Sequence, residues 1–191
     1  MRHAPSGATR RAAFPDDEPL DADGSEQASR LAGRLPSPCD AFTSPRLRCR
    51  QTSSLAGLDA QVEPRIVECD FGSWAGRTLA EVHDAAPAAA EQWMTDPNAR
   101  PHGGESLTDF SDRIAGWLDD AAASASASDC TVAVTHGGVV KAAVVHAVGA
   151  PVMAFWRIEV APLTLTELRA HDHRWTVQHL NFPAGGSGGA P

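Results

Sequence analysis

Apolar residues recur along this chain at helical spacing in several segments. The clearest helix is predicted to follow Ser106, where six apolar positions fall on one face. These positions are Leu107, Phe110, Ile114, Trp117, Leu118 and Ala121. Further helices are predicted over residues 25–35, 46–56, 87–93 and 139–148, and one that begins with a capping-box pattern at Thr78.

Short apolar runs at 40–44 and 130–135 have the length of buried strands in a parallel sheet. Three β-rich runs follow at 155–160, 164–169 and 175–180, which predicts a hairpin or meander at one sheet edge. Between such elements, residues 5–24 hold prolines and glycines and are expected to form a long loop.

Two low-complexity segments bear on the domain organisation. The glycine-rich stretch 184–191 is predicted to be a flexible tail, and the Ala/Ser run 121–128 a fraying helix end or a short internal linker. With 191 residues, 42% of them hydrophobic, the chain can bury one core. We therefore expect a single domain over 1–183.

Charge and cysteine content exclude several classes of protein. A net charge of −8 disfavours nucleic acid and acidic membrane surfaces as partners, because their binding depends on neutralising phosphates. The four cysteines show no CxxC pair and no zinc-like spacing with histidine, so neither a disulfide framework nor a structural metal is expected. No leader and no apolar run of membrane-spanning length is found, which predicts a cytoplasmic protein.

Two histidines stand out by their surroundings. His3 directly follows Arg2, whose guanidinium offers donors suited to phosphate oxygens. His136 follows a predicted buried strand and precedes Gly137 and Gly138, and a strand, glycine turn and helix in this order place a side chain at the ligand-binding edge of an α/β sheet. The structural alternatives are a surface dipeptide for His3 and a packed or capping role for His136.

Arginines and one glutamate add to this picture. Arg46, Arg48 and Arg50 alternate at the start of a predicted helix, where an inward-facing guanidinium would bind an anion, although spacing alone leaves open which of them faces inward or whether all are solvated. Glu68 lies between Val67 and Cys69, a partly desolvated position that suits a general acid; a surface or capping role is the alternative.

Other polar residues have weaker claims to a function. Ser106 is predicted to be a helix N-cap with Asp109 three residues later, although the amides there could also bind an anion. Arg10, in the loop 5–24, could touch a substrate or simply be solvated. A metal site at residues 171–173 would need more ligands than the sequence offers.

These pieces together resemble the histidine phosphatase superfamily, in its phosphoglycerate-mutase-like branch, over nearly the whole chain. Arg2-His3 is similar to its Arg-His-Gly motif, with Ala4 in the glycine position. The other matching segments follow in the family's order and lie at residues 19–28, 44–52, 67–76, 103–106 and 135–138. One such match would be weak, but several in order make coincidence improbable.

The resemblance implies a three-layer α/β/α sandwich with a mostly parallel, phosphoglycerate-mutase-like sheet. It implies a phosphomonoesterase that acts on a small phosphorylated metabolite through a phosphohistidine, with no metal or other cofactor. His3 would be the nucleophile and Glu68 the proton donor, and Arg2, Arg48 and His136 would hold the phosphate oxygens. The resemblance makes bystanders of Arg46 and Arg50. Possible substrate contacts are Ser6, Arg10, Ser106 and Gly137.

Two alternatives from other classes stay open. A phosphoglycerate mutase would use the same groups but transfer the phosphoryl group back, and such enzymes usually have a longer insertion after the Glu68 position. A non-catalytic phospho-ligand-binding relative would be expected to have lost one of the core residues, yet His3, Arg48, Glu68 and His136 are all present. The oligomeric state is not predicted.

The N-terminus departs most from the family. Relatives have an apolar strand before the nucleophile, whereas only Met1 and Arg2 precede His3. Neighbouring strands would then lose ladder partners, and an unpaired buried amide costs about 1 to 3 kcal/mol. We therefore expect either a reading frame that starts further upstream or a first strand that is missing or replaced, with reduced stability.

Overall fold

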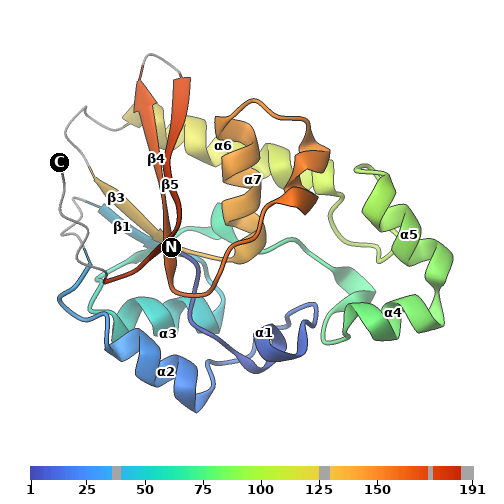
Figure 1. The fold of residues 1–191 in the computed structure, drawn as a ribbon, viewed down its shortest axis with the longest axis horizontal. Coiled ribbons are helices and arrows are strands. Elements are labelled where there is room, and N and C mark those ends of the chain that lie inside the picture. The colour runs from blue at the N-terminus through green and yellow to red at the C-terminus, as the bar shows by residue number, and fades with distance from the viewer. Residues whose placement is uncertain (36–39, 125–129, 172–173, 186–191) are drawn as a thin grey trace.

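The computed structural model describes residues 1–35, 40–124, 130–171 and 174–185 (Figure 1). The helices are α1 (Gly7–Arg11), α2 (Ala22–Ser29), α3 (Leu47–Leu55), α4 (Leu79–Ala85), α5 (Pro87–Thr95), α6 (Leu107–Ser124) and α7 (Gly137–Ala147), with 3₁₀ helices η1 (Pro64–Ile66), η2 (Gly72–Trp74) and η3 (Val152–Arg157). The strands are β1 (Asp40–Thr43), β2 (Gln61–Val62), β3 (Thr131–Val134), β4 (Thr164–His171) and β5 (Arg174–Pro183).

The sheet is built around β1, which is parallel to β2 on one side and to β3 on the other. Phe42 pairs with Gln61 in β2 and with Ala133 in β3. Strands β4 and β5 form an antiparallel hairpin. The predicted strands at 40–44, 130–135, 164–169 and 175–180 are confirmed.

The first three residues join the parallel sheet to the hairpin. The His3 amide donates to the Thr135 carbonyl at 2.8 Å and the Thr135 amide to the Met1 carbonyl at 2.9 Å. On the other side, the Arg2 amide donates to the Thr164 carbonyl and the Leu163 amide donates to the Arg2 carbonyl, each at 3.1 Å. The prediction that neighbouring strands lose ladder partners here is therefore wrong, because a segment of three residues supplies them.

Helices cover both faces of the parallel sheet, as Figure 1 shows. Neighbouring side chains of β3 point to opposite faces of the sheet, so the core has one part on each face. Ala133 packs against the apolar residues of α6 and α7 on one face. Val134 packs against Cys49 of α3 and Leu31, just after α2, on the other. The predicted three-layer α/β/α architecture is confirmed. Ligand sites in such folds lie at the carboxyl edge of the parallel strands.

The run 155–160 was predicted to be a strand, and this prediction is wrong. Residues 152–157 form the 3₁₀ helix η3 after Pro151. Phe155 and Trp156 turn into the core, with their ring centroids 5.0 Å apart and Phe155 packed edge-on against Phe110. A β-rich run becomes a strand only where a sheet edge is free to pair with it, and here aromatic packing decides the conformation.

The segment 5–24 is more regular than predicted. Ser6 caps α1 by accepting from the Thr9 amide, and Asp21 caps α2 by accepting from the Gly24 amide at 2.7 Å. Helix α2 therefore starts before the predicted boundary and ends at Ser29. Gly24 is required by packing, since a Cβ there would lie 2.1 Å from the Pro5 carbonyl oxygen.

Other helix predictions are confirmed, among them the capping box at Thr78 and Glu81 that begins α4. Residues 186–191 of the tail predicted over 184–191, residues 125–128 of the Ala/Ser run and two residues of the polar turn, 172–173, lie outside the described residues. In the part of the chain that is described, no helix is long and apolar enough to cross a membrane.

Candidate active site

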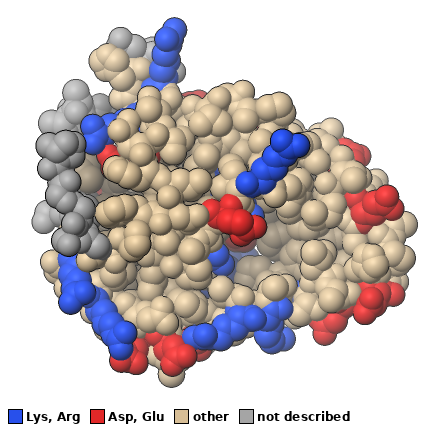
Figure 2. Space-filling model, viewed as in Figure 1, with Lys and Arg blue, Asp and Glu red and all other residues tan. Residues whose placement is uncertain are grey.

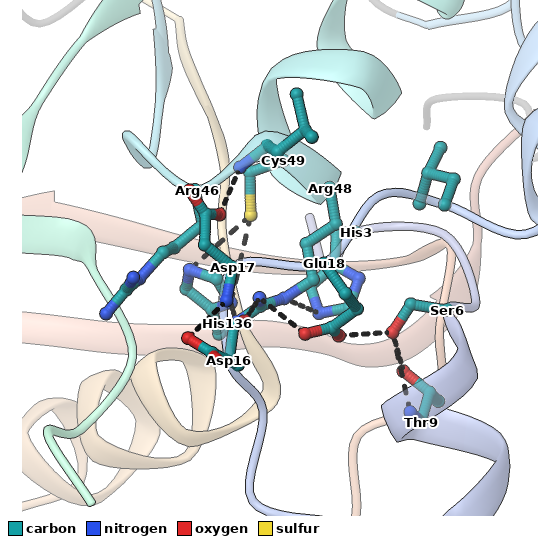
Figure 3. Close-up of polar contacts among 12 residues, drawn as sticks. His3, Ser6, Thr9, Asp16, Asp17, Glu18, Arg46, Arg48, Cys49 and His136 are labelled. Atoms are coloured by element: carbon teal, nitrogen blue, oxygen red, sulfur yellow. Dashed lines mark hydrogen bonds and ion pairs between the residues drawn. The ribbon is translucent and has the colours of Figure 1, made fainter. Parts of the chain in front are cut away.

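Four segments bring polar side chains to the carboxyl edge of the parallel sheet. Ser44 follows β1, His136 follows β3, and His3 ends the N-terminal segment between β3 and β4. Arg48 enters from the first turn of α3. Figure 3 shows the side chains of His3, Arg48 and His136 converging. His3, Ser44, Arg48 and His136 are all buried, with 4%, 0%, 1% and 0% of their surface exposed.

Arg48 lies between the two histidines. Its Nε donates to His3 Nε2 at 3.3 Å, and its Nη2 donates to His136 Nδ1 at 3.1 Å. Because a guanidinium can only donate, both ring nitrogens that it contacts must be unprotonated. His3 therefore carries its proton on Nδ1, which donates to the Ala4 carbonyl at 2.6 Å, and His136 carries its proton on Nε2, which is 2.7 Å from Ser44 Oγ.

Burial keeps both histidines neutral. Desolvation, followed by the positive charge of Arg48, lowers the pKa of His3 to about 3. The same causes, with His3 itself, lower the pKa of His136 well below its usual value. The rings lie edge to face with centroids 5.3 Å apart. The site therefore presents an imidazole whose Nε2 lone pair is available at neutral pH.

Acid is expected to destabilise the fold through His3. Its pKa is 6.5 in the unfolded chain and about 3 in the folded one, so only the unfolded state binds a proton between these values. The free energy of unfolding is then unaffected above pH 6.5 and falls below it by up to about 1.4 kcal/mol per pH unit. Urea unfolding between pH 7 and 4 measures this slope. His3→Ala should reduce this slope, to which the buried His136 also contributes, and His83→Ala, at an exposed site, should leave it unchanged; equal slopes in all proteins would contradict a buried neutral His3.

Glu68 lies at the amino end of α7. Its Oε2 accepts from the Gly138 amide at 3.2 Å and its Oε1 from the Cys69 amide at 3.1 Å. The positive end of the helix dipole favours a carboxylate there. Gly138 leaves no room for a side chain, because a Cβ would lie 2.1 Å from Glu68 Oε1. The second glycine after His136 thus makes space for the glutamate.

Arg2 borders the same site. Its Nη1 donates to the Val160 carbonyl, and its guanidinium packs over Gly137, where a Cβ would be 3.3 Å from Arg2 Nε. That Nε is buried and has no hydrogen-bond partner within the described residues. Burial lowers the pKa of Arg2, and the nearby carboxylate of Glu68 counters part of this effect. An unpaired donor of this kind is uncommon unless a ligand completes it.

Three residues predicted to contact substrate make hydrogen bonds or ion pairs to other residues of the protein. The Ser106 hydroxyl donates to Asp109 at 2.6 Å and accepts from its amide, which confirms the predicted cap. The exposed Arg10 is bound to Asp21 and Asp23. Ser6 is buried at 1% exposure, and its hydroxyl donates to Glu18 rather than facing solvent. Substrate contacts from Ser6, Arg10 and Ser106 stay predictions.

Sequence reasoning did not single out Glu18, Asp16 or Ser44. The Asp16 carbonyl accepts from Arg48 Nη1 at 2.6 Å, and a Glu18 carboxylate oxygen lies 3.7 Å from the same nitrogen. The only available signal was the run of carboxylates before Pro19. Asp17 from that run caps α3 by accepting from the Leu47 amide at 2.7 Å. These contacts need the loop to fold back, which no local pattern encodes.

The surface above the site is hollowed between α1, α4 and α7, and both acidic and basic side chains border the hollow (Figure 2). Over residues 1–35, 40–124, 130–171 and 174–185, no group of three or more His, Cys, Asp or Glu side chains is placed to hold a metal ion. Arg2 and Arg48 supply the fixed positive charge beside the histidines.

A parallel sheet covered on both faces, with a histidine and arginine cluster at its carboxyl edge, places this protein among α/β enzymes that bind ligands at that edge. More narrowly, the chain belongs to the histidine phosphatase superfamily (branch 1), whose family model matches residues 1–183.

Several of its relatives are named as phosphatases. Glucosyl-3-phosphoglycerate phosphatase of Mycolicibacterium vanbaalenii is 35% identical over 103 residues, which span 51% of this chain and only 46% of that relative. Putative phosphoserine phosphatase 2 of Hydrogenobacter thermophilus is 27% identical over 95% of this chain and 93% of its own. A structure of mycobacterial glucosyl-3-phosphoglycerate phosphatase with VO3 superimposes with a TM-score of 0.82 at 27% identity, covering 95% and 96% of the two chains.

Proposed function

We propose that this protein is a phosphomonoesterase that hydrolyses small phosphate esters through a phosphohistidine on His3, without a metal ion. One observation carries the proposal: Arg48 donates to the facing nitrogens of His3 and His136, which leaves the His3 Nε2 lone pair unprotonated inside a cationic site. An imidazole in this state is a good nucleophile at neutral pH.

The reaction proceeds in two displacements. In the first, the Nε2 lone pair of His3 forms a bond to phosphorus while the P–O bond of the ester breaks, and Glu68, in its protonated form, gives its proton to the leaving alcohol. In the second, water attacks the phosphohistidine, Glu68 takes a proton from it, and the N–P electron pair returns to His3. Acid and base assistance of this kind contributes about 10²- to 10⁴-fold to the rate.

Three groups stabilise the phosphoryl oxygens. Arg48 turns its donors from the imidazoles to the phosphate, and the unpaired Nε of Arg2 supplies another. His136 needs a proton on Nδ1 to donate as well, whereas Nδ1 now accepts from Arg48. The hydroxyl of Ser44 permits this change, because it can accept from Nε2 or donate to it at the same 2.7 Å distance.

Trapping the intermediate tests the proposal. Rapid quenching with a ³²P-labelled ester should give an acid-labile, base-stable phosphoprotein, and phosphate release should continue in EDTA and stop with vanadate. Loss of turnover in EDTA that a divalent ion restores would contradict the metal-free scheme. Transfer of the label to an acceptor ester without release would identify a mutase. Absence of both label and release would identify a non-catalytic phosphate-binding protein.

Gly138→Ala tests the role of Glu68 without changing the glutamate. The added methyl group would meet Glu68 Oε1 at 2.1 Å, and the flexible carboxylate must move away from the α7 amides. We expect kcat to fall by about 10²- to 10⁴-fold, the contribution of a general acid. The melting temperature should change little, because the atom displaced is the end of a side chain.

Gly116→Ala is the matched control. Gly116 lies within α6, and an added Cβ meets no atom within 4 Å. Alanine there should raise stability by about 0.5 to 1 kcal/mol and leave turnover unchanged. Full activity of Gly138→Ala would show that the carboxylate position is not needed for the reaction.

A further inference from the structure

A carboxylate that the reaction does not use lies against Arg48. Glu18 Oε2 is 3.7 Å from Arg48 Nη1, too far for a hydrogen bond but within ion-pair distance. The Arg48 side chain is 1% exposed, whereas that of Glu18 is 24% exposed. Glu18 therefore stands at the border between the buried phosphate-binding arginine and the solvent.

Glu18 is held in this place by buried contacts. Its Oε1 accepts from the Ser6 hydroxyl at 2.8 Å, and Ser6 also accepts from the Thr9 amide as the cap of α1 (Figure 3). Ser6 pairs with Leu20 across an antiparallel bridge, and the Leu20 amide donates to the Gln51 side chain at 2.8 Å. The carboxylate cannot move away from Arg48 without losing or straining its hydrogen bond from Ser6.

A cavity begins on the far side of Glu18. Its volume is about 350 Å³, and its wall includes the apolar residues Phe14 and Leu20, the acidic residues Asp16, Glu18 and Asp21, and the basic residue Arg11. Asp16 and Glu18 both contact Arg48 and both line the cavity, so these two residues stand between it and the phosphate-binding arginine. An ester bound at Arg48 and His3, with its alcohol part turned toward this cavity, would pass Glu18.

The negative charge of Glu18 determines which charged groups on the alcohol part of the ester bind favourably. Arg48 Nη1 already donates to the Asp16 carbonyl, and Glu18 accepts a hydrogen bond from Ser6, so its carboxylate keeps further lone pairs for a ligand. A substrate ammonium group there gains an ion pair, whereas a second phosphate or a carboxylate is repelled by Glu18.

We propose that Glu18 is a specificity-determining residue, which makes this enzyme prefer phosphate monoesters of amino alcohols over esters that carry a second anionic group. This inference rests on the proposed phosphatase function. It assigns to Glu18 no part in bond breaking, so its removal changes the ranking of substrates rather than the chemistry.

Three esters of the same size test the preference: phosphoethanolamine, 2-hydroxyethyl phosphate and 2-phosphoglycolate, which are cationic, neutral and anionic in the alcohol part. The wild-type kcat/KM should fall in that order. In Glu18→Gln, the ratio of the first to the third should drop by about tenfold or more, as expected for one partly solvated charge. A ratio measured within one variant does not depend on how much of that protein is folded.

Glu26→Gln is the matched control, since it removes the same charge from an exposed residue of α2 that does not line the cavity. Its ratio should equal that of the wild type. An unchanged ratio in Glu18→Gln, or a wild type that prefers the anionic ester, would overturn the inference while leaving the phosphatase intact. If none of the three esters is hydrolysed and no phosphoprotein is trapped with any ester, both the inference and the proposed function fail.

Discussion

Replacing His3 with alanine is expected to leave a folded protein that neither releases phosphate nor takes up label. His3 Nε2 is the unprotonated nitrogen that faces the cationic site, and no other side chain can replace its lone pair in the N–P bond. Loss of a nucleophile of this kind typically reduces kcat by about 10⁴- to 10⁶-fold. Rates of phosphate release and rapid-quench labelling measure the two effects.

The fold should tolerate this change because the backbone, not the imidazole, anchors the N-terminal segment. The His3 amide keeps its 2.8 Å hydrogen bond to Thr135, and the Ala4 amide keeps its 3.0 Å bond to Thr52 Oγ1. His179→Ala, in exposed β5, is the control and should be fully active. A label found on His136 in the wild type would reverse the roles of the two histidines.

Arg48→Lys should also reduce activity strongly, although it conserves the positive charge. One guanidinium now reaches His3 Nε2, His136 Nδ1 and the Asp16 carbonyl. A lysine ammonium is a compact charge that cannot span these partners or present a planar fork to a phosphoryl group. Loss of a preorganised donor costs about 10²- to 10³-fold in kcat, and loss of tautomer control over His3 adds to it.

Arg50→Lys is the control for this prediction. It makes the same change two residues further along α3, at an exposed position. Its kcat/KM should match that of the wild type. Comparable losses in the two variants would contradict a special role for the buried contacts of Arg48. Steady-state kinetics with one ester suffice for the comparison.

The choice among the three arginines illustrates the limit of sequence reasoning. Spacing left Arg46, Arg48 and Arg50 equivalent, and only the family resemblance selected Arg48. In the folded chain Arg48 is buried and Arg50 is exposed. The difference arises because α3 lies against β3 and the N-terminal segment, and residues two apart on a helix face in different directions.

The N-terminal segment shows a second limit of sequence reasoning. The sequence predicts that three residues are too few to pair with neighbouring strands, yet both edges of this segment are hydrogen bonded. Strand prediction counts residues along the chain, whereas a ladder requires only that neighbours on each side offer free amides and carbonyls. Thr135 and Leu163 do so here, and neither position could be inferred from residues 1–3 themselves.

Sequence alone determined the features that are local in the chain. Helical period, strand-length apolar runs and capping patterns predicted most elements, because each depends on residues within a few turns of one another. The motif around His136 likewise placed it after a strand and before a helix, as β3 and α7 confirm. The fold class itself followed from the resemblance of the ordered motifs to the histidine phosphatase superfamily.

Only the tertiary structure decided which groups meet and in what protonation state. Arg48 touches His3 across 45 residues and His136 across 88, and these contacts, with burial, fix both tautomers and lower both pKa values. Glu18 lies against Arg48 from a loop that was expected to be irregular. The physical reason is that desolvation and charge depend on all atoms within a few ångströms, whichever part of the chain supplies them.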